Sequence, residues 1–283
     1  MALQTLNLIG AGRVGQTLGR LWADRNSLVV QDVLTRSPGS AQAACAFMGV
    51  GRAVAALSDM RNADLWMLAE PDAHLPAAAL ALAAAGQPTA VAFHCSGALG
   101  AHVLDPLAQR GWQTASAHCI LSFTTPQASV AQFAQTPCAL EGMAGACAQL
   151  QAVFSDIGAL CFALESDKKL LYHAAAVFAT NFLPVLQDVA EAAWQDAGVP
   201  AALLDGLRTR LLRNAVANIE RLGPAGALTG PAARGDVEAI ARQELAVMAW
   251  DPAAGAAYGA LSALALRMAK TSRDAAATSA SST

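Results

Sequence analysis

The residues Leu8-Ile9-Gly10-Ala11-Gly12-Arg13-Val14-Gly15 join an apolar run to a helical pattern through a G-x-G-x-x-G turn, which indicates the class of fold. The run Leu3–Ile9 predicts a strand, and Gly15–Arg25 predicts a helix. Gly10 permits the tight turn, Gly12 lets the backbone approach a pyrophosphate, and Gly15 lets the helix pack on the strand. Free amides and the helix dipole then hold the anion. The alternative is a glycine-rich turn without a ligand, but the strand and helix around it favour dinucleotide binding.

The same alternation of short apolar runs and helical patterns continues outward from this turn as far as residue 165. Further strands are predicted at Leu28–Leu34, Ala53–Leu57, Leu65–Ala69, Thr89–His94, Thr114–Ile120, Cys138–Glu141 and Leu160–Leu164. Helices are predicted at Ser40–Gly49, Asp72–Ala85 and Ala144–Ile157. This order is typical of an α/β protein with a doubly wound, mainly parallel sheet covered by helices. Residues 1–165 are therefore predicted to form a Rossmann-type dinucleotide-binding domain.

From Ser166 onward the sequence predicts helices and no strand, which indicates a second, all-helical domain. The expected helices are Ser166–Ala197, Ala201–Leu222, Asp236–Ala249 and Ala253–Lys270. We expect residues 166–270 to form a substrate or dimerisation domain, and the small, polar residues 271–283 to be disordered. The apolar content of the second and fourth helices exceeds what one small helical layer can hide, so a homodimer is predicted.

Composition narrows the possible functions. Of the 283 residues, 55% are hydrophobic and 14% are charged, which favours a large core over disorder. The formal net charge of -3 argues against a nucleic-acid surface. The first residues lack the basic start of a secretory signal, and the alanine/leucine stretches are far shorter than the about 20 residues of a membrane span. The six cysteines form no C-x-x-C pair. We therefore expect a cytoplasmic protein with reduced thiols and without metal, membrane or nucleic-acid partners.

The residues after the second predicted strand favour NADP over NAD. NAD enzymes usually place an acid at the end of this strand to bind the ribose 2'-hydroxyl. Here Thr35-Arg36-Ser37 follow Leu34. Arg36 can pair with a 2'-phosphate, and the hydroxyls of Thr35 and Ser37 can donate to it. Two alternatives remain, with Asp32 inside the strand as the ribose ligand or Arg36 as an ordinary surface arginine.

Polar residues at the ends of the fifth and sixth strands form the far rim of the expected cleft, because ligands of such sheets bind outside the carboxyl ends of the strands. Ser96 and Gly97 can hold the nicotinamide or a substrate carboxylate through hydroxyl and amide donors. His118 can reach the substrate. The alternatives are an ordinary turn at Ser96-Gly97 and a structural histidine bonded to the backbone at position 118.

The first helix of the second half carries a polar stripe. At about 100° per residue, Lys169, His173 and Thr180 share one face, with Asn181 at its edge. Buried polar groups need partners or water, and a cleft facing the nicotinamide supplies both. His173 is the first candidate for a general acid, Lys169 is the second or holds a substrate carboxylate, and Asn181 can orient the reacting group. The alternative leaves Lys169 in solvent and bonds His173 to a core carbonyl.

The loop Ala227–Asp236 between two predicted helices holds one further candidate. Asp236 can cap the following helix, with Glu238 in its first turn. Arg234 has no such role, and a loop arginine beside a cleft suits a carboxylate or a phosphate. Arg234 is therefore a candidate substrate ligand, with an ordinary surface position as the alternative.

Four motifs together carry a family resemblance. They are Leu8–Gly15, His94-Cys95-Ser96-Gly97-Ala98-Leu99, Tyr172–Ala179 and Leu228-Thr229-Gly230-Pro231. The chain, to about Lys270, resembles predicted bacterial NADP-dependent oxidoreductases that pair a Rossmann-like domain with a helical domain of unknown function. More distantly it resembles pyrroline-5-carboxylate reductase, ketopantoate reductase and the β-hydroxyacid dehydrogenases. Those enzymes place a helical dimerisation domain after the nucleotide-binding domain, so the resemblance implies the same arrangement here.

The match to the hydroxyacid enzymes is uneven along the chain. Their Ser-Gly after the fifth strand corresponds to Ser96-Gly97. Their Lys–Asn pair on the first long helix fits less closely, since His173 stands one turn after Lys169 and Asn181 two turns further on. Relatives in the predicted family often show His-Pro in the sixth strand, where this chain has His118-Cys119.

These residues favour an enzyme that moves hydride from NADPH to a small carbonyl or imine acid. One alternative is a non-catalytic NADP-binding sensor or scaffold that has kept the fold. Another is a helical protein-interaction module fused to a Rossmann domain that has lost its original activity. A stripe facing the cofactor favours the enzyme, whereas a stripe in solvent or in an apolar core favours the sensor. The fold itself does not fix the substrate.

Overall fold

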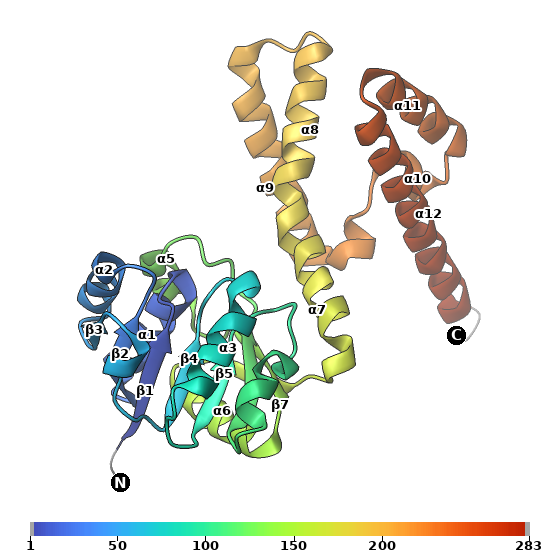
Figure 1. Cartoon of the computed structure of the whole chain (residues 1–283). Helices are drawn as coiled ribbons and strands as arrows, with labels where there is room; N and C mark the ends of the chain where they lie inside the picture. Colours follow the sequence, from blue (N-terminus) through green and yellow to red (C-terminus); the bar gives the residue numbers. More distant parts are fainter. Residues whose placement is uncertain (1–2, 281–283) are drawn as a thin grey trace. The chain divides into compact units, whose positions relative to one another are not determined.

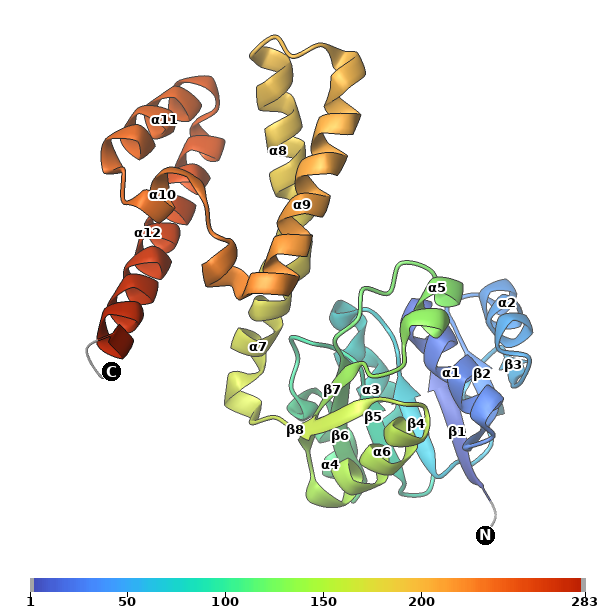
Figure 2. The same cartoon turned by 180° about the vertical axis from the view of Figure 1, so that it is seen from behind.

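The computed structural model describes residues 3–280 and divides into two compact units, Met1–Asn181 and Phe182–Thr283 (Figures 1 and 2). The first unit is built on an eight-stranded sheet in the order β3-β2-β1-β4-β5-β6-β7-β8. Its strands are β1 (Gln4–Ile9), β2 (Leu28–Leu34), β3 (Arg52–Val54), β4 (Leu65–Leu68), β5 (Val91–His94), β6 (Gln113–Cys119), β7 (Pro137–Gly142) and β8 (Leu160–Ala163). Neighbouring strands are parallel except β6 and β7. The predicted Rossmann-type α/β fold is confirmed.

Apolar residues that alternate along the central strands build a core on both faces of the sheet. Leu65 and Met67 of β4 belong to one buried cluster, and Trp66 and Leu68 to another. This follows from the period of two in a strand, which sends successive side chains to opposite faces. The helices of this unit are α1 (Arg13–Arg25), α2 (Pro38–Met48), α3 (Leu75–Ala84), α4 (Asp105–Ala108), α5 (Pro126–Gln132), α6 (Ala144–Asp156) and α7 (Lys169–Ala176).

The two clusters lie beneath different helices. The first cluster includes Trp22 of α1 and Phe154 of α6, whose rings pack edge to face with centroids 5.3 Å apart. Trp22 also donates a hydrogen bond of 2.9 Å to the Val153 carbonyl group, so its indole nitrogen is satisfied although the residue is buried. The second cluster includes Leu75 and Leu82 of α3, and Leu107 of α4. The sheet is thus covered on both faces, as a parallel sheet requires.

The segment predicted as one helix, Ser166–Ala197, is not a continuous α-helix. A 3-10 turn at Ser166–Lys168 leads into α7, a π-helical stretch covers Val177–Asn181, and α8 follows at Phe182–Asp196. A π-helical turn adds a residue to the turn, which hydrophobic periodicity does not reveal. The first compact unit reaches Asn181, beyond the predicted boundary at residue 165, because α7 packs on the sheet through the buried Lys169.

The second unit is helical, as predicted. Its remaining helices are α9 (Ala201–Ala227), α10 (Gly230–Arg234), α11 (Val237–Trp250) and α12 (Pro252–Ala280). α9 is kinked at Gly223, next to Pro224. The loop expected before Asp236 contains the short helix α10. The tail predicted to be disordered instead continues α12 as far as Ala280, and its residues 281–283 lie outside the described residues.

Burial in the second unit is sparse. Among its described residues the buried apolar side chains are those of Leu204, Ile240 and Ala269. Large apolar side chains are exposed on every long helix of this unit, with Leu203 at 60% and Leu245 at 71%. Single exposed apolar residues are normal on a protein surface, but here they occur on all the long helices of the unit.

One helical stretch among the described residues, Ser166–Asp196, is long and apolar enough to cross a membrane by length and composition. The alanine/leucine runs considered in the sequence did not reveal it, because its apolar residues are of mixed type. Its first turns contain Lys169, which is buried against the sheet. Helices of globular proteins pass the same test of length and composition.

Candidate cofactor and substrate site

The glycine turn, residues 10–15, connects β1 to α1, and its glycines meet different constraints. Gly10 has a φ of +84°, and an added Cβ would lie 2.7 Å from the Ala69 carbonyl group. A Cβ on Gly12 would meet no atom of the described residues within 4 Å. The protein's own packing therefore requires a glycine at position 10, whereas the open space at Gly12 is available to a ligand.

The start of α1 is suited to an anion. Gly12, its N-cap residue, has no side chain with which to cap the helix. The first amides of a helix lack partners within the helix, and they carry the positive end of its dipole. Arg13 is exposed at the first position of α1, while Val14 is partly buried against the core. The backbone of this turn thus fits a pyrophosphate.

A cavity of about 840 Å³ opens beside the glycine turn, a size that falls within the range of small-molecule sites. Three of its walls come from the turn, from the segment after β2 and from the segment after β4. Its lining residues are Gly10, Ala11, Gly12, Gln16, Thr35, Arg36, Ser37, Ser40, Ala43, Ala69, Glu70, Pro71, His74, Ala77 and Ala78. The structure therefore brings the predicted pyrophosphate turn and the predicted 2'-phosphate ligands to one cavity.

The segment Thr35–Ser37 lies at the cavity with its hydroxyl groups already engaged. Thr35 Oγ1 donates to the Ser37 carbonyl oxygen at 2.8 Å, and Ser37 Oγ accepts from the Ser40 amide at 3.3 Å to cap α2. Ser37 Oγ and Ser40 Oγ lie 2.8 Å apart. Arg36, which lies between Thr35 and Ser37 in the sequence, is exposed. The guanidinium of Arg36 is thus the cation at this wall, beside the N-terminus of α2.

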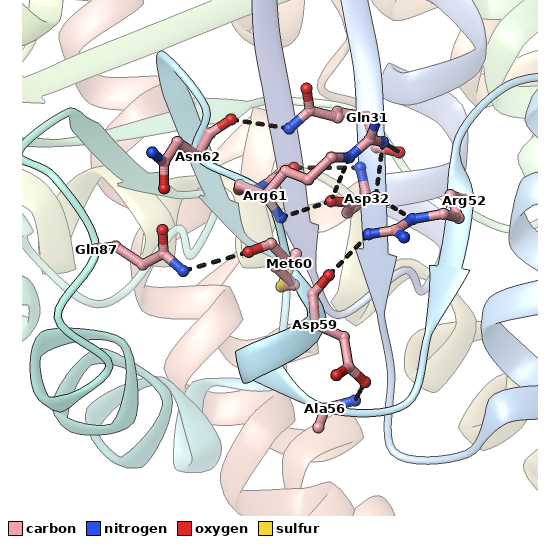
Figure 3. A network of polar contacts seen from close by, with 10 residues as sticks. Gln31, Asp32, Arg52, Ala56, Asp59, Met60, Arg61, Asn62 and Gln87 are labelled. Atoms are coloured by element: carbon pink, nitrogen blue, oxygen red, sulfur yellow. Dashed lines mark hydrogen bonds and ion pairs between the residues drawn. The ribbon is translucent and has the colours of Figure 1, made fainter.

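Asp32, the alternative ribose ligand, is fully buried in β2 and is paired there (Figure 3). Its carboxylate accepts hydrogen bonds from Arg52 Nε at 2.8 Å, from Arg61 Nη2 at 2.8 Å and from the Arg61 amide at 2.7 Å. Burial alone raises the pKa of this carboxyl group, but the hydrogen bonds from Arg61 and Arg52 outweigh it and hold the pKa well below its usual range. Because the Asp32 carboxylate is already bonded to Arg52 and Arg61, it is a poor candidate for the ribose ligand.

The turn after β5 is closed by its own hydrogen bonds. Ser96 Oγ accepts from the amides of Ala98 at 3.2 Å and Leu99 at 2.9 Å. His94 is buried, with Nε2 3.1 Å from the Gly100 carbonyl oxygen and Nδ1 3.2 Å from the Ser96 amide. Burial, opposed by the bond to Gly100, lowers the pKa of His94 to about 4. Ser96 therefore shapes this turn, and among the described residues its hydroxyl group is seen only as an acceptor.

β6 and α7 bring His118, Tyr172 and His173 together over Gly97. His118 Nδ1 lies 3.0 Å from the Tyr172 hydroxyl oxygen, and the rings of His118 and His173 pack edge to face with centroids 5.6 Å apart. A Cβ on Gly97 would collide with His173 Nδ1 and lie 2.7 Å from His118 Nε2, so the missing side chain makes room for both rings. His118 and His173 thus face the turn after β5, as the sequence predicts for two walls of one site.

The two imidazoles differ in their hydrogen bonding. His173 Nδ1 is buried and has no hydrogen-bond partner among the described residues. Buried polar atoms without a partner are rare in proteins and mark places where a ligand or water completes the structure. Burial, together with the charges of His173 and Lys169, lowers the pKa of His118 to about 4. His118 is therefore neutral at pH 7 and serves as a hydrogen-bond partner, not as a cation.

Lys169 lies deeper, in a closed polar cluster. Its side chain is 2% exposed, its ammonium donates to Ser116 Oγ, and Nζ lies 3.8 Å from Glu141 Oε2. Burial lowers the pKa of Lys169, opposed chiefly by the charge of Glu141. The amine that was expected to hold a substrate carboxylate is thus engaged with Ser116 and Glu141 inside the protein.

Two further predicted site residues share no side-chain hydrogen bond or ion pair with these groups in the described part of the chain. Asn181 is exposed at the end of the π-helical stretch, where its Oδ1 accepts a hydrogen bond of 2.8 Å from Thr180 Oγ1. Arg234 is exposed at the last position of α10 in the second unit. Their roles toward a substrate stay predictions.

Three residues that contact His118 or Lys169 were not predicted as site residues. Ser116 and Glu141 lie within predicted strands, and Tyr172 is not among the residues of the predicted polar stripe. An acid at the end of the apolar run Cys138–Glu141 was a signal for Glu141, because a buried carboxylate requires a partner. Its partner lies 28 positions away on another element, and no local pattern predicts that distance.

Comparisons with known proteins agree with this architecture. A Rossmann-like domain matches residues 2–119, and a domain of unknown function, DUF2520, matches residues 136–265. The chain thus combines the two domains that the sequence motifs indicate. No curated protein matches the sequence.

Solved structures share the fold over almost the whole chain. A Thermotoga maritima protein has a TM-score of 0.75 at 24% identity, covering 95% of this chain and 99% of its own. A Bacteroides fragilis protein, provisionally assigned as an NADP oxidoreductase, has a TM-score of 0.72 at 21% identity, covering 94% and 98%. The 1-pyrroline-5-carboxylate reductase of Streptococcus pyogenes has a TM-score of 0.59 at 13% identity, covering 94% and 99%. At these identities the likeness shows the fold.

Proposed function

We propose that this chain, which joins a Rossmann-like domain to a DUF2520 domain, is an NADP-dependent oxidoreductase that reduces a small carbonyl or imine acid. The observation that carries the proposal is the cavity of about 840 Å³ that places the glycine turn and Arg36 on shared walls. The open space at Gly12 and the uncapped start of α1 fit a pyrophosphate, and Arg36 fits a 2'-phosphate.

The bound cofactor supplies the hydride, and the protein supplies orientation and a proton. His173 is the group we assign to the proton, since its Nδ1 is buried, unpaired among the described residues and aimed at the turn after β5. Reduction of a carbonyl or an imine leaves negative charge on oxygen or nitrogen, which a positioned imidazole neutralises. The substrate binds, in this proposal, against Gly97 with His118 as a neutral hydrogen-bond partner.

Turnover of NADPH tests the proposal. The full chain is mixed with NADPH and a panel of 2-ketoacids and cyclic imine acids, and cofactor oxidation is followed by absorbance. We expect at least one substrate class to be reduced, and His173→Ala to lower that rate about 10²–10⁴-fold while NADPH affinity is unchanged. NADPH binding without turnover of any panel member would support a non-catalytic sensor. A His173→Ala variant as active as the parent would remove His173 from the mechanism.

We further propose that the chain works as a cytoplasmic homodimer. The exposed apolar side chains of the second unit support a second copy as the partner, because few of its apolar residues are buried within the unit. The formal net charge of -3 favours a small-molecule substrate over a nucleic acid as the ligand.

A further inference from the structure

Glu141 occupies an unusual place for a carboxylate. It lies in β7 directly opposite Ser116 of β6, and it is 4% exposed. Removing a charge from water is costly, so a buried carboxylate persists only where donors or cations surround it. Glu141 meets this condition through groups from three different segments.

Glu141 has two hydrogen-bond donors and one ion-pair partner, and each belongs to a segment that borders the candidate site. Oε2 accepts a hydrogen bond of 2.8 Å from the Ala101 amide, at the end of the turn after β5. Oε1 accepts a hydrogen bond of 2.6 Å from Ser166 Oγ, where the chain leaves the sheet. The Lys169 ammonium, in the first turn of α7, lies 3.8 Å from Oε2.

These contacts fix two walls of the site relative to each other. Ala101 follows Gly97 closely, and Lys169 precedes His173 by about one helical turn. The second anchor of Lys169, Ser116, lies on the same strand as His118 and shares its face. One carboxylate therefore holds both the turn that carries Gly97 and the helix that carries His173.

We propose that Glu141 is a positioning residue for the reaction proposed above, which fixes the His173 imidazole against Gly97 by binding the Ala101 amide and the Lys169 ammonium together. Its charge balances that of Lys169, and its two oxygens set the spacing of the walls. Glu141 touches neither cofactor nor substrate in this account. Displacing a reacting group by about 1 Å is enough to lower turnover about 10²-fold.

The chain contains five histidines, so their imidazole signals can be resolved by NMR in the 15N-labelled full chain. In Glu141→Gln we expect the signals of His118 and His173 to shift, and that of His74, which lines the cofactor cavity, to stay. The affinity for NADPH should remain within about twofold of the parent. The control Glu165→Gln removes an exposed carboxylate beside Ser166 and should leave all five signals in place.

A milder variant covers the case in which Glu141→Gln does not fold. Ser166→Ala removes one donor to Glu141 without changing a buried charge, and should shift the same two signals by less. Unchanged His118 and His173 signals in a folded variant, or equal shifts of all five histidines, would overturn the proposal. Failure of the parent chain to bind NADPH contradicts the proposed function instead, and the imidazole signals report on Glu141 independently of it.

Discussion

The two units of this chain bury their apolar residues very differently. In the first unit, strands and helices enclose two continuous clusters, with Leu18, Trp22 and Phe93 fully buried. In the second, the buried apolar side chains among the described residues are Leu204, Ile240 and Ala269. A layered sheet can close its own core, whereas a few long helices leave apolar stripes that need another surface. The first unit thus closes its own core, whereas the second leaves apolar side chains exposed, which supports the proposal that it associates with a second copy.

Matched leucine truncations give the largest effect. Leu18 of α1 is fully buried, and Leu245 of α11 is 71% exposed. Leu18→Ala should lower the free energy of unfolding by about 2–5 kcal/mol, because it removes buried methyl groups and leaves a cavity. Leu245→Ala should lower it by less than about 1 kcal/mol. Urea unfolding of both variants measures this, and equal losses would break the comparison between the units.

The two units should also differ in their contribution to dimerisation. Val216, Ile219 and Leu222 are exposed and spaced three apart on α9. We expect the parent to be a dimer by light scattering, and Ile219→Asp to raise its dissociation constant about 100-fold, since a charge would be buried in the interface. Leu80→Asp, at an exposed position on α3, is the matched control in the first unit and should leave the dimer intact. A monomeric parent at micromolar concentration would contradict the proposed role of the second unit.

Acid should act on the first unit through His94. Its folded pKa of about 4 lies below the ordinary value near 6.5, so the unfolded chain takes up the proton first as pH falls. The stability that depends on neutral His94 is therefore complete above pH 6.5 and is lost toward pH 4, by about 3 kcal/mol. His94→Gln should flatten this dependence in urea unfolding series between the two pH values. A slope identical to that of the parent would mean that His94 does not contribute.

The sequence predicted the framework well and the site only in part. β2 was predicted at its observed bounds, because strand alternation and the flanking turn residues are local signals. His118 and His173 were placed toward one site, since strand ends and helix faces follow from fixed periods. The contacts of Lys169 with Ser116 and Glu141 were not predicted, because they join residues from three elements. The π-helical stretch was missed for a related reason, and it shifts the direction of Asn181 relative to an ideal helix.

Replacing Arg36 should give the smallest of these effects, and it tests the cavity wall that we propose for the 2'-phosphate. Arg36→Ala should weaken NADPH binding by about 1–3 kcal/mol, or about 5–150-fold, because a charged hydrogen-bonded contact to the 2'-phosphate is lost. NADH affinity should stay unchanged. Arg25→Ala, which removes an exposed arginine from the opposite end of α1, should alter neither affinity.

We propose that the first unit binds NADPH as the cofactor of a reductase. Calorimetric titration of the full chain with NADPH and with NADH, at one salt concentration, tests this binding. We expect saturable binding of NADPH that is at least about tenfold tighter than that of NADH, with most of this preference lost in Arg36→Ala. Equal affinities for the two cofactors, or no binding of NADPH, would contradict it.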